Sequence, residues 1–357
     1  MKKIRVAVAL SGGIDSASAA YLLKKKGYDV FGVYLRMYDD PQHDFTQRKK
    51  DLDSICCKLG IELCIIDARQ KFSAEIIEPF CREYVEGRTP NPCIECNSSL
   101  KFSFLFEKAK DMGADRIATG HYARVDYDRA LGRYLLKKGI DREKDQSYFL
   151  YRVDGSILNR TLMPLGELYK FQVRRISLQF CKELNQKQES QEICFIPGND
   201  YRAYIMSRTD SIFPPGDITD KNQKVLGRHR GIINYTVGQR KGLGIAAKRP
   251  LYVTGIDREN NRIIAGERED AFAKTLIIED TCWHVPQPEK TIRVKARIRY
   301  RHIPEYAWVS PLSKGLYKIS FENPQFAVTP GQSAVFYRYN KVLGGGIINK
   351  VFKEDRA

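Results

Sequence analysis

Six consecutive residues near the N-terminus, Ser11-Gly12-Gly13-Ile14-Asp15-Ser16, could bind an anion. They follow an apolar run from Ile4 to Leu10, which predicts a buried strand, and precede Ala17 to Lys26, which predicts a helix. Glycines in such a turn let backbone N–H groups approach phosphate oxygens, and the helix dipole favours negative charge there. The segment is not the Gly-x-x-x-x-Gly-Lys-Ser/Thr loop, because the chain contains no Gly-Lys dipeptide. It therefore predicts a phosphate site of another type.

Three cysteines in polar, turn-rich segments could do sulfur or metal chemistry. Cys93 and Cys96 lie between Gly87 and Asn97, where two prolines predict a loop and exclude a helix. A helix is expected to start near residue 101, and its positive end should lower the pKa of a thiol in that loop. Cys194 lies in the segment from Glu189 to Pro197, a polar run followed by a short apolar stretch. A structural zinc site is not indicated, because the chain has no second Cys-x-x-Cys and no His-x3–5-His.

Two further segments leave two interpretations open. Lys144-Asp145-Gln146 precedes an apolar stretch, so Asp145 could be only a helix N-cap. The basic, glycine-rich segment from Gly238 to Gly244 could lie against phosphates, and it could equally be an ordinary hairpin turn.

Strands and helices alternate in the first part of the chain. Strands are expected at 4–10, 29–35, 61–66 and 115–119, and helices at about 16–26, 47–59, 73–86 and 101–112. This alternation predicts an α/β fold with a parallel sheet and helices on both faces. Ligands of such sheets bind at the carboxyl ends of the strands. Ser11 to Ser16, Leu35 and Gly120 all follow strand ends, so we expect them to meet in one crevice.

The pattern changes beyond residue 205. Residues 147–185 look mainly helical, whereas Pro214-Pro215-Gly216-Asp217 predicts a turn at a domain boundary and residues 250–266 predict a hairpin. Further strands are expected at 294–301, 317–321, 333–337 and 342–348. We therefore predict three domains: a catalytic domain over 1–205, a small central β domain over 206–280, and a C-terminal β-barrel over 281–357.

The 357-residue chain is strongly basic, with 60 Lys and Arg against 43 Asp and Glu, a net charge of +17. This charge suits a polyanionic partner, nucleic acid before membrane. Basic clusters such as Arg240-Lys241, Lys248-Arg249 and Arg297 to Arg301 fit RNA contact, or are a solvated surface. No apolar run of about 18 residues occurs and no signal peptide follows Met1, so we expect a cytoplasmic protein without a membrane segment. Nine cysteines there do not predict a disulfide framework.

The phosphate-loop candidate resembles the pyrophosphate loop (PP-loop) of the ATP pyrophosphatases, which cleave ATP to AMP and pyrophosphate. Over nearly its whole length the chain also resembles the tRNA-specific 2-thiouridylases, which place sulfur on C2 of the wobble uridine of certain tRNAs. The resemblance rests on segments that occur in the family's order: Gly87 to Pro92, Cys96-Asn97 before Lys101-Phe102, Ala118 to Tyr122, Lys144 to Leu150, Ile193 to Ile196, Gly238 to Gly244, Thr329 to Ala334, and Leu343 to Ile347.

The resemblance implies an adenine nucleotide alpha hydrolase-like first domain and a role for many residues. ATP and Mg²⁺ would be bound at Ala9, Leu10, Ser11, Gly12, Gly13, Ile14, Asp15, Ser16, Leu35 and Gly120. Asn91, Pro92 and Cys93 would lie against the target base, with His121 near the adenylated base. Contacts with tRNA would be made by Lys144, Asp145, Gln146, Arg299, Tyr300 and Gln332. A sulfur-donor protein would load Cys194 as a persulfide, and Cys96 would be its partner in a later disulfide.

This chemistry explains the residue types. The oxygen at uridine C2 is a poor leaving group, and adenylation turns it into AMP, which leaves easily. Cys96 can then attack the persulfide on Cys194, which frees sulfur and leaves a Cys96–Cys194 disulfide. The reacting base must be flipped out of its stack.

One departure from the family leaves the sulfur source open. The family usually has aspartate where this chain has Cys93, so Cys93, Cys96 and Cys194 could instead hold an iron–sulfur cluster. A different ATP pyrophosphatase and a non-catalytic RNA-binding protein are the remaining alternatives. The separated cysteine motifs and the C-terminal β region argue against the first, and the intact Ser11-Gly12-Gly13 loop with Asp15, Cys96 and Cys194 argues against the second.

Overall fold

The computed structural model describes residues 3–39, 44–186, 193–313 and 315–353. The chain forms two compact units. The first unit comprises residues 1–77, 92–199 and 339–343, and the second comprises residues 78–91, 200–338 and 344–357. No helix in the described residues is long and apolar enough to cross a membrane.

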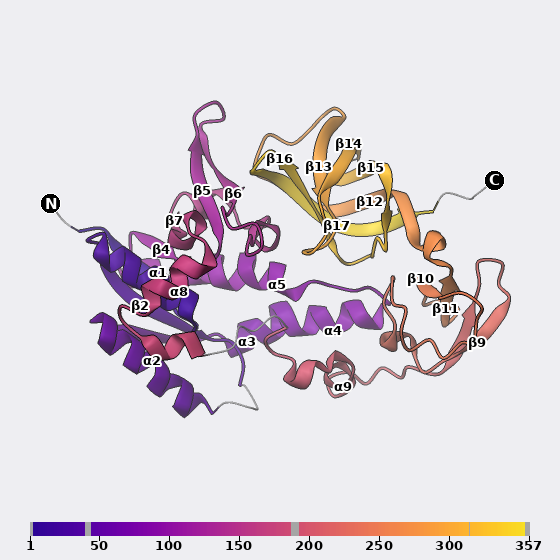
Figure 1. The fold of residues 1–357 in the computed structure, drawn as a ribbon, viewed down its shortest axis with the longest axis horizontal. Coiled ribbons are helices and arrows are strands. Elements are labelled where there is room, and N and C mark those ends of the chain that lie inside the picture. The colour runs from indigo at the N-terminus through magenta and orange to yellow at the C-terminus, as the bar shows by residue number, and fades with distance from the viewer. Residues whose placement is uncertain (1–2, 40–43, 187–192, 314, 354–357) are drawn as a thin grey trace. The chain divides into compact units, whose positions relative to one another are not determined.

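The first unit contains the expected parallel sheet (Figure 1). Its strands, in the order β3-β2-β1-β4-β7, are β3 (Leu63–Asp67), β2 (Asp29–Arg36), β1 (Arg5–Ala9), β4 (Arg116–Ala118) and β7 (Thr161–Leu162). Every pairing is parallel. Because all the strands run the same way, their carboxyl ends lie at one edge, where the phosphate-loop candidate follows β1.

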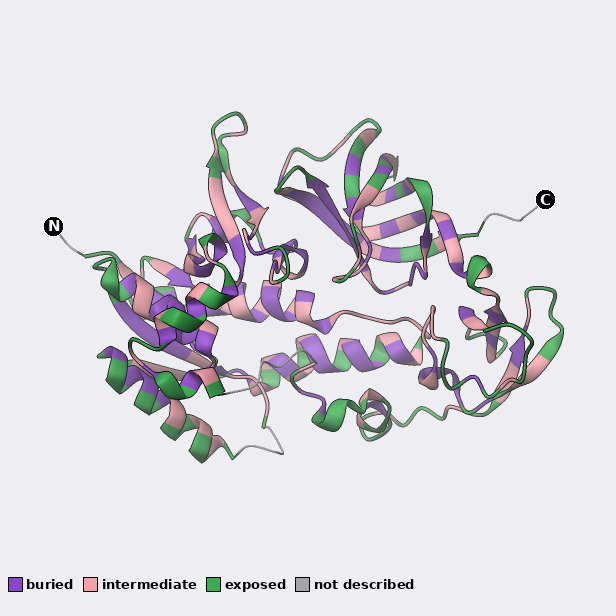
Figure 2. Cartoon of the chain, viewed as in Figure 1, coloured by how far each residue is buried: buried purple, intermediate pink, exposed green. Residues whose placement is uncertain are grey.

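Helices cover both faces of this sheet. On one face α1 (Ile14–Lys25), α2 (Phe45–Leu59) and α8 (Lys170–Ser177) share a core with Val6 and Val8 of β1. On the other face α6 (Leu105–Asp111) packs against β4, and its buried Leu105 and Ala109 lie outside that core. Figure 2 shows the division within α2, whose inner side is buried and whose outer side is exposed.

The region around the cysteines is more helical than the prolines suggested. The helix expected at 73–86 is α3 (Arg69–Phe72), a π-helix η1 (Ser73–Ile77) and α4 (Glu78–Val85). The helix expected from residue 101 already begins with α5 (Pro92–Glu95) and continues as a π-helix η2 (Cys96–Phe104) into α6. The prediction that prolines exclude a helix was therefore wrong at Pro92. A proline is tolerated as the first residue of a helix, where its missing N–H has no partner to lose.

Residues 147–185 are mainly helical, as expected, but the helices are short: η3 (Ser147–Leu150), α7 (Gly155–Leu158), η4 (Pro164–Glu167), α8 and η5 (Lys182–Gln186), with β7 among them and η6 (Pro197–Asn199) beyond. An antiparallel hairpin of β5 (Ala123–Asp128) and β6 (Arg133–Lys138) was not predicted.

The second unit holds the small β sheet and the closed barrel. The sheet has the order β10-β11-β8-β9, and β10 (Tyr252–Asp257) and β11 (Arg262–Gly266) are the predicted hairpin. Before the hairpin come α9 (Tyr201–Met206), β8 (Gly216–Thr219), β9 (Val225–His229) and η7 (Ile232–Asn234), and η8 (Arg268–Ala271) follows it. The barrel order is β12-β15-β14-β13-β16-β17, and β12 pairs with β17 to close it. Its strands are β12 (Phe272–Trp283), β13 (Ile292–Arg297), β14 (Glu305–Ser313), β15 (Leu316–Phe326), β16 (Ser333–Arg338) and β17 (Lys341–Phe352).

Candidate active site

The phosphate-loop candidate is held by its own serines. Ser16 Oγ donates to the carbonyl of Gly13 at 3.1 Å and accepts from the N–H of Ser11 at 3.1 Å. Gly12 has φ +79°, which favours glycine. Gly13 is the N-cap of α1 and no side chain caps this helix, so within the described residues the N–H groups of Ile14 and Asp15 have no acceptor. The loop thus offers donors at the positive end of a helix, as an anion requires.

Gly120 brings the end of β4 against this loop. A Cβ at Gly120 would lie 2.7 Å from the backbone carbon of Asp15 and 2.7 Å from the nitrogen of Ser16. Only glycine allows so close an approach. Leu10, Ile14 and Leu35 are buried and Ala9 is half-buried. These four apolar side chains therefore pack in the interior next to the phosphate loop.

Asp15 is paired with a lysine that the sequence did not reveal. Lys170 Nζ lies 2.8 Å from both carboxylate oxygens of Asp15, and the hydroxyl of Tyr122 donates to Asp15 Oδ1 at 2.7 Å. Lys170 is the first residue of α8, and its side chain is 10% exposed against 34% for Asp15. The N–H of Lys170 donates to Asp141 Oδ2 at 2.9 Å, which fixes the start of the helix. A buried cation therefore stands beside the phosphate loop.

A second cation comes from α2. The Nη1 atom of Arg48 lies 3.7 Å from the position that a Cβ of Gly12 would take. Arg48 also lines a hollow of about 250 Å³, together with Tyr34, Arg36 and Phe45. The guanidinium of Arg36 lies 4.0 Å from the centre of the Phe45 ring, an arrangement that favours the cation.

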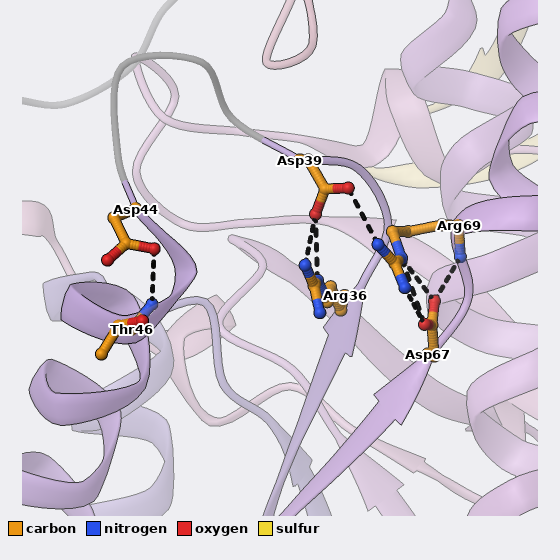
Figure 3. Close-up of polar contacts among 6 residues, drawn as sticks. All are labelled: Arg36, Asp39, Asp44, Thr46, Asp67 and Arg69. Carbon is orange, nitrogen blue, oxygen red and sulfur yellow. Dashed lines mark hydrogen bonds and ion pairs between the residues drawn. The ribbon is translucent and has the colours of Figure 1, made fainter.

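Ion pairs join the ends of β2 and β3 beside this hollow (Figure 3). Arg36 pairs with Asp39 at 2.6 Å, and Arg69 pairs with Asp39 at 2.9 Å and with Asp67 at 2.6 Å. The hydrogen bonds from Arg69 lower the pKa of the Asp67 carboxyl to about 2. These carboxylates are therefore charged at neutral pH, and they orient both arginines at the edge of the sheet.

The three cysteines lie in the same unit and differ in exposure. Cys96 is buried and its thiol donates to the sulfur of Met37 at 3.8 Å, whereas Cys194 is exposed. Phe195 and Ile196, which follow Cys194, are buried, and the Phe195 ring packs edge-on against Phe72. Residues 189–192 of the predicted motif lie outside the described residues. Cys194 is thus an accessible thiol on an anchored segment.

The π-helix η2 places a lysine beside Cys96. In a π-helix the hydrogen bonds run between residues i and i+5, so Cys96 and Lys101 share one face. In an α-helix the same two side chains would point about 140° apart. Burial lowers the pKa of Lys101, but the neighbouring thiols of Cys96, Cys194 and Cys93 outweigh it and raise that pKa. Lys101 therefore lies near enough to all three thiols for their charges to interact.

The expectation of a low thiol pKa was wrong. Burial raises the pKa of Cys96 to about 11, and Lys101 opposes this rise only in part. Burial also raises the pKa of Cys93, again against Lys101. The physical reason is that Cys93 and Cys96 lie within a helical segment, where Cys96 is buried and Cys93 half-buried, and not in an exposed loop before a helix.

His121 lies between Gly120, which packs against the phosphate loop, and Lys101, which interacts with the thiols. It follows Gly120, its Nδ1 lies 3.0 Å from Thr119 Oγ1, and its ring packs 5.6 Å from that of Phe102. Burial, and then the charge of Lys101, lower the pKa of His121 to about 3. The imidazole is therefore neutral at physiological pH, with one ring nitrogen as a hydrogen-bond donor and the other as an acceptor.

The residues present do not fit an iron–sulfur cluster. Among the described residues no group of three or more His, Cys, Asp or Glu is placed to hold a metal ion.

The expected tRNA contacts of the first unit fall into two kinds. Asp145 is buried; its Oδ1 accepts from the N–H groups of Gly139 and Ser147, and its Oδ2 from the Ser147 hydroxyl. The amide oxygen of Gln146 accepts from the N–H of Tyr122 at 3.0 Å. Lys144 is half-buried. Asp145 and Gln146 thus hold their loop together, beside the segment that carries His121.

Among the expected contacts of the second unit, Gln332 forms hydrogen bonds with residues far from it in the sequence. Gln332 donates to the carbonyls of Thr89 at 2.8 Å and Pro90 at 3.3 Å, immediately before Asn91. A Cβ at Gly331 would lie 2.9 Å from backbone atoms of Thr89. Arg299 and Tyr300 are half-buried in the turn after β13, which the N–H of His302 closes by donating to the carbonyl of Arg299 at 3.0 Å.

Sequence comparisons identify relatives of the whole chain. Family models described as tRNA methyl transferase HUP domain, tRNA methyl transferase PRC-barrel domain and aminomethyltransferase beta-barrel domain match residues 4–198, 205–267 and 273–348. The tRNA-specific 2-thiouridylase MnmA 2 of Thermoanaerobacter sp. (strain X514) is 44% identical, over 98% of this chain and 99% of its own length. The tRNA-specific 2-thiouridylase MnmA of Clostridium perfringens (strain 13 / Type A) is 42% identical, over 98% and 100%.

Among solved structures, NMN synthetase from Francisella tularensis is 22% identical, over 53% of this chain and 66% of its own, with a TM-score of 0.34. The full-length relatives and the match over residues 4–198 decide the assignment. The chain belongs to the tRNA-specific 2-thiouridylase family.

Proposed function

We propose that this protein is a tRNA 2-thiouridylase that uses a persulfide on Cys194. It adenylates the C2 oxygen of the wobble uridine with ATP, and then replaces that oxygen by sulfur. The products are 2-thiouridine, AMP and pyrophosphate. The observation that carries this proposal is the position of the segment Thr119 to Tyr122. Gly120 packs against the phosphate loop, and the hydroxyl of Tyr122 donates a hydrogen bond to Asp15. Between them, His121 has its pKa lowered in part by the charge of Lys101, which also interacts with the thiols.

The activation step is assigned to the crevice around Ser11 to Ser16. The C2 oxygen attacks the α-phosphorus of ATP, a new P–O bond forms, and the bond to the leaving pyrophosphate breaks. The loop N–H groups would bind the phosphates, and Leu35 and Gly120 would line the nucleotide site. Asp15 is the residue that would hold Mg²⁺, which supplies positive charge to the phosphates. Lys170 is ion-paired with Asp15 and Arg48 lies near Gly12, so both cations are close to the phosphate loop. They would stabilise the negative charge of the departing pyrophosphate.

The sulfur step is assigned to Cys194 and Cys96. A donor protein would convert the exposed Cys194 to a persulfide. The terminal sulfur forms a bond to C2, and AMP leaves with the original oxygen. The Cys96 thiolate attacks Cys194 Sγ, which breaks the persulfide S–S bond and forms a Cys96–Cys194 disulfide. An external thiol reductant then restores both cysteines. The exposure of Cys194 suits loading by a protein, and the burial of Cys96 protects it between turnovers.

The tRNA contacts follow the family resemblance. Asn91, Pro92 and Cys93 would lie against the flipped base, and Lys144, Arg299 and Tyr300 would contact the tRNA. Asp145, Gln146 and Gln332 would act by holding the loops that carry these contacts. A tRNA substrate and free cysteines both fit a cytoplasmic location.

The test is a reconstituted reaction with chelator-treated protein. The mixture contains ATP, Mg²⁺, a persulfide donor and unmodified tRNA with a wobble uridine, and mass spectrometry reads 2-thiouridine and AMP. We expect both products in equal amounts. The Cys194→Ser variant should form neither 2-thiouridine nor the disulfide, whereas Cys57→Ser, which removes another exposed thiol, should be active. Absence of 2-thiouridine in the wild-type reaction would refute the proposal.

A further inference from the structure

A basic loop in the second unit lines a separate hollow. Residues 240–249, between β9 and β10 in Figure 1, border a hollow of about 590 Å³. The loop carries Arg240, Lys241, Lys248 and Arg249, all exposed, and no Asp or Glu occurs between residues 236 and 256. Only Arg249 has an acidic partner among the described residues, Glu267 at 3.0 Å. The loop is therefore a concentrated positive surface.

The backbone of this loop offers unused donors. In the described part of the chain, no N–H group of residues 240–249 donates a hydrogen bond to another residue. The flanking residues do donate: Gly238 to the carbonyl of Val253 at 2.8 Å, and Val253 to the carbonyl of Gln239 at 2.9 Å. Consecutive N–H groups that no carbonyl satisfies are suited to anionic oxygens.

The small apolar core of the β sheet and the Gln239 side chain hold the loop in its shape. Leu243 is buried in one core with Val253 and Ile263, and Ile245 packs against that core. The Gln239 side chain accepts from the N–H of Thr236 at 3.1 Å and donates to the carbonyl of Lys241 at 3.0 Å.

Three glycines, one just before the loop and two within it, have positive φ angles. Gly238 has φ +91°, and a Cβ there would lie 2.5 Å from the Ala327 side chain. Gly242 and Gly244 have φ +82° and +68°. These conformations favour glycine, so the donors are held in place before any ligand arrives.

We propose that the 240–249 loop binds the phosphate backbone of the tRNA substrate, away from the reacting base. The proposal rests on the proposed function, and it assigns part of the affinity for tRNA to the loop between β9 and β10. Four cations and a row of backbone donors match a chain of phosphates, because phosphate oxygens accept from both kinds of group. The hollow is also larger than a single phosphate group requires. Phosphate contacts carry no base identity, so this loop adds affinity and register without choosing the tRNA.

The first test compares two double variants of equal charge change. Arg240→Ala/Lys248→Ala alters the loop, and Lys224→Ala/Arg258→Ala alters exposed residues elsewhere in the same unit. Affinity for a tRNA transcript with a wobble uridine is measured between 50 and 200 mM salt. We expect the loop variant to bind at least about tenfold more weakly, and the slope of log K against log salt to fall by about 1.5. The control should bind within about twofold of wild type, and both should keep the wild-type kcat at saturating tRNA.

The second test reads the backbone donors directly. Amide hydrogen exchange of peptides covering 240–249 is followed with and without the tRNA. Unbonded amides exchange fast in the free protein, and binding should slow them at least about tenfold.

The outcomes separate this inference from the proposed function. Wild-type protein that thiolates tRNA, combined with a loop variant that matches the control and amides that gain no protection, overturns the inference alone. Wild-type protein that neither binds nor thiolates tRNA overturns the proposed function and this inference together.

Discussion

One lysine lies beside the phosphate loop and another beside the thiols of Cys93, Cys96 and Cys194, and the two lysines meet different partners. Lys170 faces a carboxylate at 2.8 Å on both oxygens, and Tyr122 adds a third hydrogen bond to Asp15. Lys101 faces three thiols, and burial raises the pKa of Cys96 to about 11. Lys170 is therefore ion-paired with a carboxylate, whereas Lys101 lies beside thiols, two of which, Cys93 and Cys96, have a raised pKa.

This difference separates the two halves of the chemistry. Around Asp15 the charges exist before the substrate arrives, so the crevice is organised for phosphates in advance. Around Cys96 negative charge arises only when a thiolate or persulfide reacts. We expect Lys101 to attract that charge as it develops, which would lower the barrier of the proposed sulfur step.

The largest effect that separates the halves is expected from Cys194→Ser. The variant lacks the sulfur carrier, so 2-thiouridine formation should fall by more than about a thousandfold. Exchange of pyrophosphate into ATP in the presence of tRNA should remain, because the phosphate loop is intact. Mass spectrometry and an exchange assay measure the two halves. Loss of exchange together with thiolation would show that the halves are not separable.

The converse is expected from Gly120→Ala. The added Cβ would meet the Asp15–Ser16 backbone at 2.7 Å and displace the loop. We expect kcat/KM for ATP to fall about a hundredfold, which corresponds to about 2.7 kcal/mol. Gly155→Ala is the matched control, since no atom lies within 4 Å of its Cβ position. Alkylation of Cys194 should be unchanged in both; an altered rate in Gly120→Ala would mean that the damage spreads to the thiols.

Replacing Lys170 tests whether its charge is needed by Asp15. Lys170→Met leaves a half-buried carboxylate without its cation, so we expect unfolding free energy to fall by about 1–3 kcal/mol and pyrophosphate exchange by about 10–100-fold. Lys71→Met removes the cation of the more exposed Lys71–Glu75 pair and should cost less than about 1 kcal/mol. Denaturant unfolding measures both. The double variant Asp15→Asn/Lys170→Met should regain stability but not exchange.

Replacing Lys101 should act on the thiols and on His121, but not on the ion pair of Asp15. Without its ammonium, the pKa of Cys96 rises further above about 11, and each added unit slows alkylation of Cys96 at pH 8 about tenfold. Lys108→Met, one turn into α6, is the control. Peptide mapping after iodoacetamide treatment gives the rate for Cys96 separately from the other cysteines. An unchanged rate in Lys101→Met would contradict the assignment of Lys101 to this thiol.

The smallest effects are those of pH on stability. His121 has its pKa lowered from 6.5 to about 3, so the folded state binds fewer protons and stability falls as pH falls between these values. Cys96 has its pKa raised from 9.0 to about 11, so its contribution is present below pH 9 and is lost as pH rises towards 11. His121→Gln should flatten the acid side only, and Cys96→Ala the alkaline side only. Unfolding midpoints across pH measure both.

The phosphate loop was predictable because its chemistry is contiguous. Ser11 to Ser16 contains the glycines, the hydroxyls and the acid in one short run. Lys170 was not predictable, because it lies 155 residues from Asp15 and only the packing of α8 brings it there. Lys101 was visible as a residue of the family motif, but its role depends on a π-helix, and in an α-helix it would point away from Cys96.

The same distinction holds for the fold. The expected barrel strands at 317–321, 333–337 and 342–348 lie within β15, β16 and β17, and each is strongly apolar. Strand β14 was missed, because Pro311 argues against a strand and is accommodated here only at a register shift. The β5–β6 hairpin was also missed, although the sequence of β5, Ala-Arg-Val-Asp-Tyr-Asp, alternates apolar and charged residues as a half-buried strand does.

The tie between Gln332 and Thr89 has a consequence for the order in which the protein is made. The two residues are 243 positions apart, so a ribosome finishes Thr89 long before the partner of its carbonyl exists. The N–H of Thr89 also waits for Pro330. The stretch that leads into Pro92 and Cys93 therefore gains this support only near the end of synthesis. In a nascent chain, Thr89 and Pro90 therefore lack these hydrogen bonds until residues 330–332 of the barrel have been synthesised.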